Sequence, residues 1–387
     1  MSRPDRIAKM VSEMAPSGIR AFFDLVVGKP NVIKLAVGEP AFSPPWHVIE
    51  AVIDSLYAGF TSYSSNQGLL RLREEIAQYL DSRFGVVVDP EKQVLVTTGV
   101  SEAIDIALRA LLEPGDEVIV TQPCYVSYAP CVELAYGKPV IIECRPEDGW
   151  QVDPERLEAA CNERTKALLI NYPCNPTGAT LSKEVLERLV ELAVKWDFVI
   201  LSDEVYAELT FEGDHTAVGS LPGAADHVLT LSGFSKAWAM TGLRLGYAAG
   251  PTDIIAAMTK IHQYTMLCAP ITAQIGGIEA LAGPSDEMRQ QLREYGRRRR
   301  VFCAGLKELG FPLVEPSGTF YAFPDIKWTG LSSQEFCKQL LMEKEVATVP
   351  GDAFGTAGDG YIRCAFATSI GQLEEALRRI KDFLAAL

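Results

Sequence analysis

The chain has 387 residues, of which 48% are hydrophobic and 22% are charged, and this predicts a globular protein of two domains. Its formal net charge of −14, with no basic stripe to offset it, argues against a nucleic-acid partner. We expect neither a membrane span nor a secretory signal, because no stretch of about 20 apolar residues and no apolar leader occur.

The middle of the chain has the pattern of alternating strands and helices. Short apolar runs predict strands at residues 94–97, 118–120, 139–142, 167–170, 198–201, 228–231 and 246–249. Between them, apolar residues at three-to-four spacing predict helices, such as 104–112 and 183–194. Alternation of this kind predicts an α/β fold in which a mostly parallel sheet is sandwiched by helices.

The pattern changes after about residue 284. Residues 286–309 predict a long helix that ends at Gly310, and residues 372–384 predict an amphipathic helix. We therefore expect a large domain over residues 41–284. A smaller α+β domain is expected over residues 285–387, with residues 1–40 packed against it.

The cysteines and histidines argue against several kinds of functional site. Its nine cysteines form no C-x-x-C pair, and none of its four histidines has a His or Cys partner at metal-ligand spacing. We therefore expect no metal site, no disulfide framework and no histidine-centred hydrolase. Free thiols in a large acidic chain favour the cytoplasm.

Polar residues follow five of the predicted strands, at the sheet edge where open α/β sheets bind ligands. They are Gly99, Val100 and Ser101 at a helix start, then Tyr125, then Asn175, then Asp203 with Tyr206, and finally Ser235 and Lys236 followed by Arg244. A helix start can hold a phosphate, a lysine amine can form a Schiff base, and a carboxylate can pair with a ring nitrogen. No strand end is followed by a dinucleotide or Walker loop. The set predicts a pyridoxal 5'-phosphate (PLP) site.

The segment around Lys236 resembles a known signature. Ser232-Gly-Phe-Ser-Lys236, continuing to Arg244, closely resembles the PLP-lysine motif of class I and II aminotransferases, which have PLP fold type I. Further motifs match the same family in the same order: Tyr63-x-x-x-x-Gly68, Asn175-Pro-Thr-Gly178, Asp203-Glu-x-Tyr206 and Tyr361-Ile-Arg363-x-x-Phe366. The resemblance covers essentially the whole chain and is closest to the subgroup acting on aspartate, aromatic amino acids or N-acetyl-L,L-diaminopimelate.

The resemblance implies a role for each residue around the cofactor. Lys236 would carry PLP and move the substrate proton, and Asp203 would pair with the pyridine nitrogen. Tyr206 and Asn175 would donate to the ring hydroxyl, and Tyr125 would stack on the ring. The phosphate would lie among Gly99, Val100, Ser101, Ser235 and Arg244. Many relatives have a serine where this chain has Gly233, so the hydroxyl contact to the phosphate must come from Ser235 or Ser232.

Substrate contacts are implied in the same way. Arg363 would clamp the α-carboxylate, with Asn175 and Gly38 beside it, although Gly38 could equally be a turn glycine. Tyr63 would reach the phosphate of a second subunit, which implies a homodimer with shared sites. Side-chain selectivity is expected near residues 17–20, where Arg20 could meet a distal carboxylate, and in the loop 264–268.

The implied activity is transfer of an amino group from an L-amino acid to a 2-oxo acid such as 2-oxoglutarate, in a ping-pong cycle through pyridoxamine phosphate. A cysteine-conjugate β-lyase on the same scaffold stays open as an alternative. A PLP-sensing half of a transcription regulator is disfavoured, because the resemblance begins near the start of the chain and the charge is −14. A cofactor-free Schiff-base lyase would lack a visible absorption band.

Overall fold

The computed structural model describes residues 6–16, 18 and 31–387. Its centre is a seven-stranded sheet with the strand order β2-β8-β7-β6-β5-β3-β4. The strands are β2 (Val94–Thr97), β3 (Glu117–Gln122), β4 (Lys138–Glu143), β5 (Thr165–Asn171), β6 (Val199–Asp203), β7 (Val228–Gly233) and β8 (Gly246–Ala249). Only β8 runs antiparallel to its neighbours. The predicted α/β fold with a mostly parallel sheet is confirmed, and every predicted strand overlaps one of these seven.

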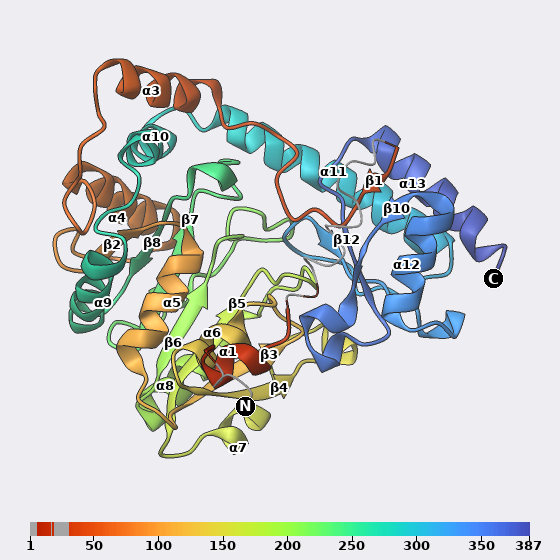
Figure 1. Ribbon diagram of the computed structural model, residues 1–387, viewed down its shortest axis with the longest axis horizontal. Helices are drawn as coiled ribbons and strands as arrows, with labels where there is room; N and C mark the ends of the chain where they lie inside the picture. Colours follow the sequence, from red (N-terminus) through yellow and green to blue (C-terminus); the bar gives the residue numbers. More distant parts are fainter. Residues whose placement is uncertain (1–5, 17, 19–30) are drawn as a thin grey trace.

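Helices cover both faces of this sheet (Figure 1). One face packs against α5 (Val100–Leu111), α6 (Tyr128–Leu134) and α9 (Thr252–Thr265), and the other packs against α7 (Pro154–Ala160) and α8 (Lys183–Trp196). Strand β5 shows why: Leu168 belongs to the core under α8, and the next residue, Leu169, belongs to the core under α5. Successive side chains of a strand point to opposite faces, so a continuous apolar run fills both cores.

Three more helices pack at the β2–β8 edge, at the upper left of Figure 1. They are α3 (Trp46–Tyr57), α4 (Leu70–Phe84) and α10 (Ile271–Ala282). From there α11 (Asp286–Glu308) runs to a smaller group of elements on the right. This is the predicted long helix, and Gly310 follows it with φ +88°, as glycine often does after a helix. None of the described helices is long and apolar enough to cross a bilayer.

The smaller group is built around α12 (Ser333–Lys344) and α13 (Ile370–Leu384), the second of which is the predicted C-terminal helix. It contains the antiparallel sheet β11 (Val349–Pro350), β12 (Ile362–Ala365) and β9 (Tyr321–Ala322), and the parallel pair β1 (Ile33–Lys34) and β10 (Val346–Ala347). Among the elements bounded within the described residues, the remaining α-helix is α1 (Lys9–Glu13). 3-10 helices lie at Pro146–Asp148, Val218–Ser220, Thr241–Leu243, Lys327–Thr329, Gly351–Phe354 and Thr356–Gly358.

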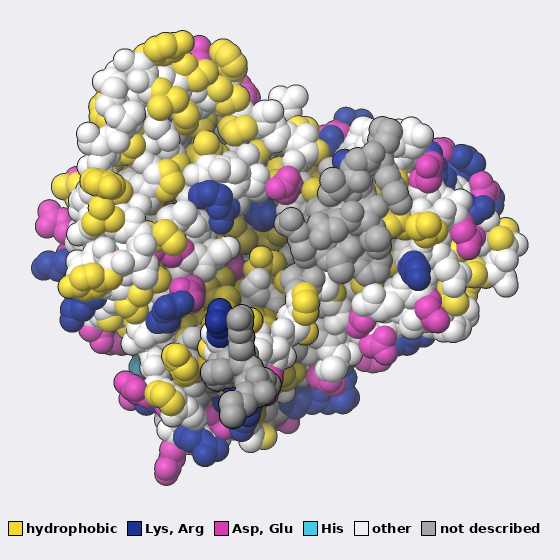
Figure 2. Space-filling view, viewed as in Figure 1, with side chains coloured by type: hydrophobic (Ala, Val, Ile, Leu, Met, Phe, Trp, Pro, Cys, Tyr) yellow, Lys and Arg dark blue, Asp and Glu magenta, His cyan; other side chains and the backbone are white. Residues whose placement is uncertain are grey.

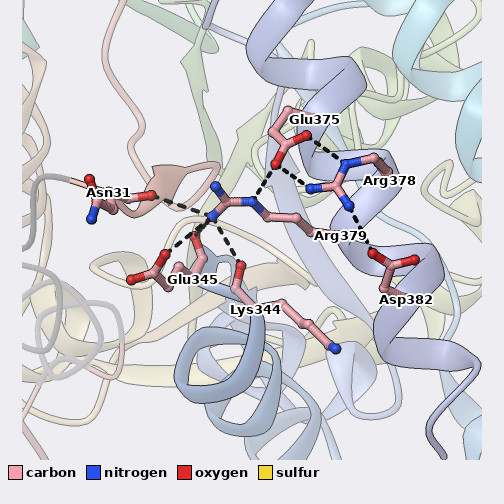
Figure 3. A network of polar contacts seen from close by, with 7 residues as sticks. All are labelled: Asn31, Lys344, Glu345, Glu375, Arg378, Arg379 and Asp382. Carbon is pink, nitrogen blue, oxygen red and sulfur yellow. Dashed lines mark hydrogen bonds and ion pairs between the residues drawn. The ribbon is translucent and has the colours of Figure 1, made fainter.

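A polar network ties the segment before β1 to the C-terminal helices (Figure 3). Nη1 of Arg379 donates to the carbonyl oxygens of Asn31 (3.4 Å) and Lys344 (3.1 Å), while its Nε donates to Glu375 (2.8 Å). Residues 31–34 therefore lie against α12 and α13, whereas α1 contacts α6 of the larger group. The division into domains at residues 41 and 285 stays a prediction.

Candidate active site

A cavity of about 360 Å³ lies at the carboxyl ends of β5, β6 and β7. Most of the predicted site residues line it: Gly38, Val100, Ser101, Tyr125, Asn175, Asp203, Tyr206, Ser235, Lys236, Arg244 and Arg363. The parallel strands bring these residues together, because their carboxyl ends meet at one edge of the sheet.

Lys236 lies in the loop after β7, and its amine faces the cavity. Nζ donates to the carbonyl oxygen of Gly38 (2.7 Å) and lies 5.6 Å from the centre of the Tyr206 ring. Burial, together with the nearby Arg363 cation, lowers the pKa of Lys236 to about 8 against the opposing effect of Glu39 and Asp203. An amine with this pKa is partly neutral near physiological pH, as a nucleophile or a base must be.

Asp203 is the last residue of β6, and its side chain is buried. Oδ2 accepts a hydrogen bond from the Tyr128 hydroxyl (2.7 Å), and Oδ1 accepts one from the backbone N–H of Val205 (3.2 Å). Burial raises the pKa of Asp203 to about 6, although these two donors and the Lys236 cation act in the opposite direction. Since a carboxylate can accept about four hydrogen bonds, Asp203 retains the capacity to bind a ligand donor.

The N-terminus of α5 and Arg244 form one wall of the cavity. The first N–H groups of a helix have no partner within it, so Val100 and Ser101 can bind an anion. Gly99 does not itself line the cavity, but a Cβ there would come within 2.7 Å of Nη2 of Arg244. Gly99 has φ +79°, so both its backbone conformation and the close arginine require a glycine.

The structure explains Gly233, the residue that replaces a serine of many relatives. A Cβ at Gly233 would lie 2.8 Å from both Cα of Gly246 and the carbonyl oxygen of Leu245, so the neighbouring strand β8 leaves no room for a side chain. Ser235 lines the cavity. The hydroxyl of Ser232 is instead directed to the carbonyl oxygen of Glu204 (3.4 Å). Of the two serines, Ser235 is therefore the one placed to contact a phosphate.

Arg363 of β12 is only 2% exposed. Nη1 donates to Oδ1 of Asn175 (2.9 Å), and Nη2 donates to the carbonyl oxygen of Ala36 (2.8 Å). Its guanidinium also lies over the Tyr321 ring at 4.4 Å. Among the described residues, Nε has no acceptor and no carboxylate pairs with this cation. An unpaired buried charge is costly, so the site favours an anionic ligand.

Gly38 and Tyr206 complete the opposite wall. A Cβ on Gly38 would lie 2.7 Å from the Tyr321 hydroxyl and 3.7 Å from Nη2 of Arg363, so the site requires glycine here for close packing. The Tyr206 hydroxyl hydrogen-bonds to that of Tyr321 (3.0 Å). Burial raises the pKa of Tyr206 well above its usual value, so the phenol stays neutral and can donate.

Two predicted features are not brought to this cavity. Tyr63 is 81% exposed and lies outside the lining, so its predicted contact with a second subunit stays a prediction. The loop 264–268 also lies outside it, and its residues Tyr264 and Met266 are exposed. Ser17 and Arg20, named for substrate selectivity, lie outside the described residues.

Three residues that line the cavity and have clear roles are not among the residues predicted from the motifs. Asn171 ends β5, and its side chain donates to the backbone oxygen of Asp203 (2.8 Å) and accepts from the backbone N–H of Asn175 (2.9 Å). A search for polar residues at the ends of the predicted strands could have identified Asn171. Tyr128 is the first residue of α6, three residues after Tyr125, and its nearness in sequence to that predicted residue could have indicated it. Tyr321 lies in a two-residue strand, and no local pattern indicates it.

Comparison with known proteins finds relatives that are similar in sequence and in fold over nearly the whole chain. Residues 30–380 match the family described as aminotransferase class I and II. The Bacillus subtilis protein YugH is 48% identical over 98% of this chain and 98% of its own length. Aspartate aminotransferase of Pyrococcus abyssi is 43% identical over 95% of this chain and 96% of its own. The crystal structure of an aromatic aminotransferase from Pyrococcus horikoshii superposes with a TM-score of 0.90, at 40% identity, over 95% of this chain and 99% of that one.

Proposed function

The chain belongs to the class I and II aminotransferase family and is an aminotransferase, and on that basis we propose that it binds PLP at Lys236 and passes the amino group of an L-amino acid to a 2-oxo acid. The donor would be aspartate, an aromatic amino acid or a related one, and the acceptor 2-oxoglutarate or a similar acid. The observation that carries the proposal is the unpaired, buried guanidinium of Arg363 in the same cavity as Lys236. Amino and 2-oxo acids share the carboxylate that would pair with it.

The cavity has a residue of suitable chemistry for each reactive group of PLP. The aldehyde suits the amine of Lys236, whose pKa of about 8 leaves part of it neutral. The ring nitrogen suits the Asp203 carboxylate, and the phosphate suits the start of α5 with Ser235 and Arg244. Tyr206 and Asn175 can donate to the ring hydroxyl, and Tyr125 can pack on the ring.

When bound, PLP supplies an electron sink that makes the α-carbon of an attached amino acid acidic. Asp203, with a pKa of about 6, is mostly a carboxylate at neutral pH and can keep a proton on the facing ring nitrogen. Arg363 binds the α-carboxylate through its planar guanidinium and so fixes the orientation of the substrate. Lys236 lies in the same cavity as Arg363, so its free Nζ would accept the α-proton of the bound substrate and return it.

Initial rates at varied donor and acceptor concentrations test the proposal. Parallel double-reciprocal lines are expected, because the first oxo acid leaves before the acceptor binds. A panel of amino donors, each mixed with the enzyme alone and followed by the colour of the cofactor, identifies the preferred donor. Converging lines would contradict the proposal. So would release of pyruvate and ammonia from a cysteine conjugate without any 2-oxo acid, which would support the β-lyase.

We expect Tyr128→Phe to move the acid limb of the kcat/KM profile upward by about one pH unit. The Tyr128 hydroxyl donates to Oδ2 of Asp203 and so lowers the pKa of that carboxyl. Loss of a hydrogen bond to a charged group, worth about 1.5–3 kcal/mol, raises this pKa, so Asp203 becomes protonated at a higher pH. Measurements of kcat/KM between pH 5 and 9 show this shift. One unit of pKa corresponds to about 1.4 kcal/mol.

Tyr172→Phe is the matched control for this variant. Tyr172 is also buried, and its hydroxyl donates to the carbonyl oxygen of Trp150 (3.0 Å) rather than to Asp203. The acid limb of the kcat/KM profile of Tyr172→Phe should therefore stay at the pH at which the wild type has it. An unmoved limb in Tyr128→Phe would show that this phenol does not control the ionisation of Asp203.

An exposed apolar surface on and after α3 supports assembly into a homodimer. Figure 2 shows hydrophobic side chains gathered at the upper left, over α3 and its neighbours. This surface includes Trp46, Ile53, Leu56, Tyr57, Phe60 and Tyr63, each at least 41% exposed. Large exposed apolar patches mark interaction sites. We propose that this surface forms the dimer interface and that Tyr63 thereby reaches the second site.

We expect a solution mass of twice 42.3 kDa, and we expect Leu56→Glu to shift the enzyme toward the monomer. A carboxylate buried without a partner in the interface costs several kcal/mol. Light scattering after size exclusion measures both masses. Met342→Glu is the control, because Met342 is similarly exposed but lies on α12. A monomeric wild type, or a Leu56→Glu variant that stays dimeric, would refute this interface. The cytoplasmic location stays a prediction.

A further inference from the structure

A second groove lies between α4, the end of α10 and α11, and it shares no lining residue with the cavity of Lys236. Its volume is about 1010 Å³. It is lined by the arginines Arg83, Arg289, Arg293, Arg297, Arg299 and Arg300, against the two carboxylates Glu208 and Asp214. The lining itself therefore carries more arginines than carboxylates, in a chain whose net charge is −14.

Four of these arginines form a stripe along α11. Arg289, Arg293, Arg297 and Arg300 follow one another at intervals of four, four and three residues, which places them on one face of the helix. The stripe is roughly 16 Å long at 1.5 Å per residue. A ligand that contacts all of it must therefore carry more than one anionic group.

Only part of this stripe is neutralised by the chain. Arg289 pairs with Asp286 (3.0 Å) and Arg297 pairs with Glu294 (3.4 Å), in each case three residues away on the same helix. Within residues 6–16, 18 and 31–387, Arg293 and Arg300 make no ion pair. The exposed side chains of Arg293 and Arg300 therefore keep a charge that is available to an anionic ligand.

Arg299 gives an independent observation. It lines the groove, is only 7% exposed, and its Nε has no acceptor among the described residues. Its Nη2 is engaged by Glu212 and by Glu315 (3.3 Å). A buried N–H without an acceptor costs free energy, and a ligand oxygen in the groove would remove that cost.

Gly296 keeps the floor of the groove open. A Cβ there would meet only Phe211 at 3.8 Å and Nη1 of Arg300 at 3.9 Å, which are ordinary contacts, so packing does not require glycine. A glycine inside a helix is nevertheless unfavourable relative to alanine. Its position between the arginines of the stripe is explained if the groove has to admit a ligand.

We propose that this groove binds a small molecule with two or more phosphate groups. Guanidinium groups match phosphate oxygens in pairs, and four of them along roughly 16 Å suit an anion with several phosphates better than a single carboxylate. Arg293 and Arg300 supply the unpaired charges, and Nε of Arg299 supplies a buried donor. The site is independent of the proposed amino-transfer reaction.

Calorimetric titration of the PLP-saturated enzyme with inorganic tripolyphosphate tests the site. Saturation with PLP keeps the probe out of the Lys236 cavity. We expect one binding event per chain, weakened about ten-fold or more in the double variant Arg293→Gln, Arg300→Gln. The control Arg378→Gln, on the surface of α13, should bind as the wild type does. Absence of binding, or equal affinity in the double variant, would overturn the proposal.

Two further measurements separate a specific site from a general attraction of anions. Gly296→Leu changes no charge but fills the groove, so it should lower affinity, while Gly296→Ala should raise the melting temperature. Both variants and the arginine double variant should retain amino transfer, which shows that they fold. Sulfate at the same ionic strength should compete weakly. Equal competition by sulfate, or unchanged affinity in Gly296→Leu, would show a nonspecific electrostatic effect instead of a phosphate site.

Discussion

We expect Lys236→Ala to lower kcat/KM for amino transfer by about 10²–10⁴-fold or more, and to remove the visible absorption band of the bound cofactor. Nζ of Lys236 is the one amine among the lining residues of the cavity, and burial holds its pKa near 8. Alanine removes both the group that would join the aldehyde and the base that would move the α-proton. Absorption spectra and single half-reactions with an amino donor measure the two losses separately.

Lys260→Ala is the matched control, because Lys260 is an exposed lysine on α9 outside the cavity. It should keep the wild-type spectrum and rate. A Lys236→Ala variant with an unchanged band and a half-reaction of normal rate would overturn the assignment of the cofactor to this residue.

The second large effect is expected for Arg363→Lys, which should lower kcat/KM by about 30–1,000-fold, mostly through a higher KM for the amino acid. Truncation of one partner in a buried charged pair costs roughly 2–4 kcal/mol. Lysine keeps the charge, but it cannot donate to Asn175 and Ala36 and at the same time bind a carboxylate through two parallel hydrogen bonds. Steady-state kinetics with the preferred donor and acceptor measure the change in each KM.

The spectrum distinguishes this variant from the first one. Arg363→Lys should retain the absorption band, since Arg363 is proposed to bind the substrate and not the cofactor. Arg378→Lys on α13 is the control and should leave both KM values unchanged. A normal KM for both substrates in Arg363→Lys would mean that another group binds the α-carboxylate.

The strands and their ends could be predicted because buried parallel strands have a strong local signal. Residues 167–170 form a continuous apolar run that fills a core on each face of the sheet, and polar residues follow immediately. The same signal predicts that Asp203 and Lys236 follow the carboxyl ends of buried strands. The order of the strands and the antiparallel β8 depend on contacts distant in sequence, and no local pattern indicates them.

Other elements were missed for a physical reason. Helix α3 buries Val48 and Ser55 on one face but exposes Trp46, Leu56 and Tyr57, so its apolar residues alone do not mark the face that is buried. Tyr321 could not be found either, since its position depends on β12 and on the ring of Tyr206, which lies 115 residues earlier. The pairing of residues 33–34 with β10 and the contact of α1 with α6 both depend on residues distant in sequence, and no local pattern indicates either of them.

Helix α11 packs in two of the hydrophobic cores among the described residues. Met288 packs in the core beside α3 and α4, Phe302 and Leu306 pack in the core of the C-terminal elements, and Leu292 contacts both. A helix of 23 residues without proline is a stiff rod, roughly 34 Å long. It fixes the separation of the two cores along its axis, so relative movement is restricted to rotation about that axis or to bending of the rod. Any such movement would carry the wall with Arg363 as one body relative to the wall with Lys236.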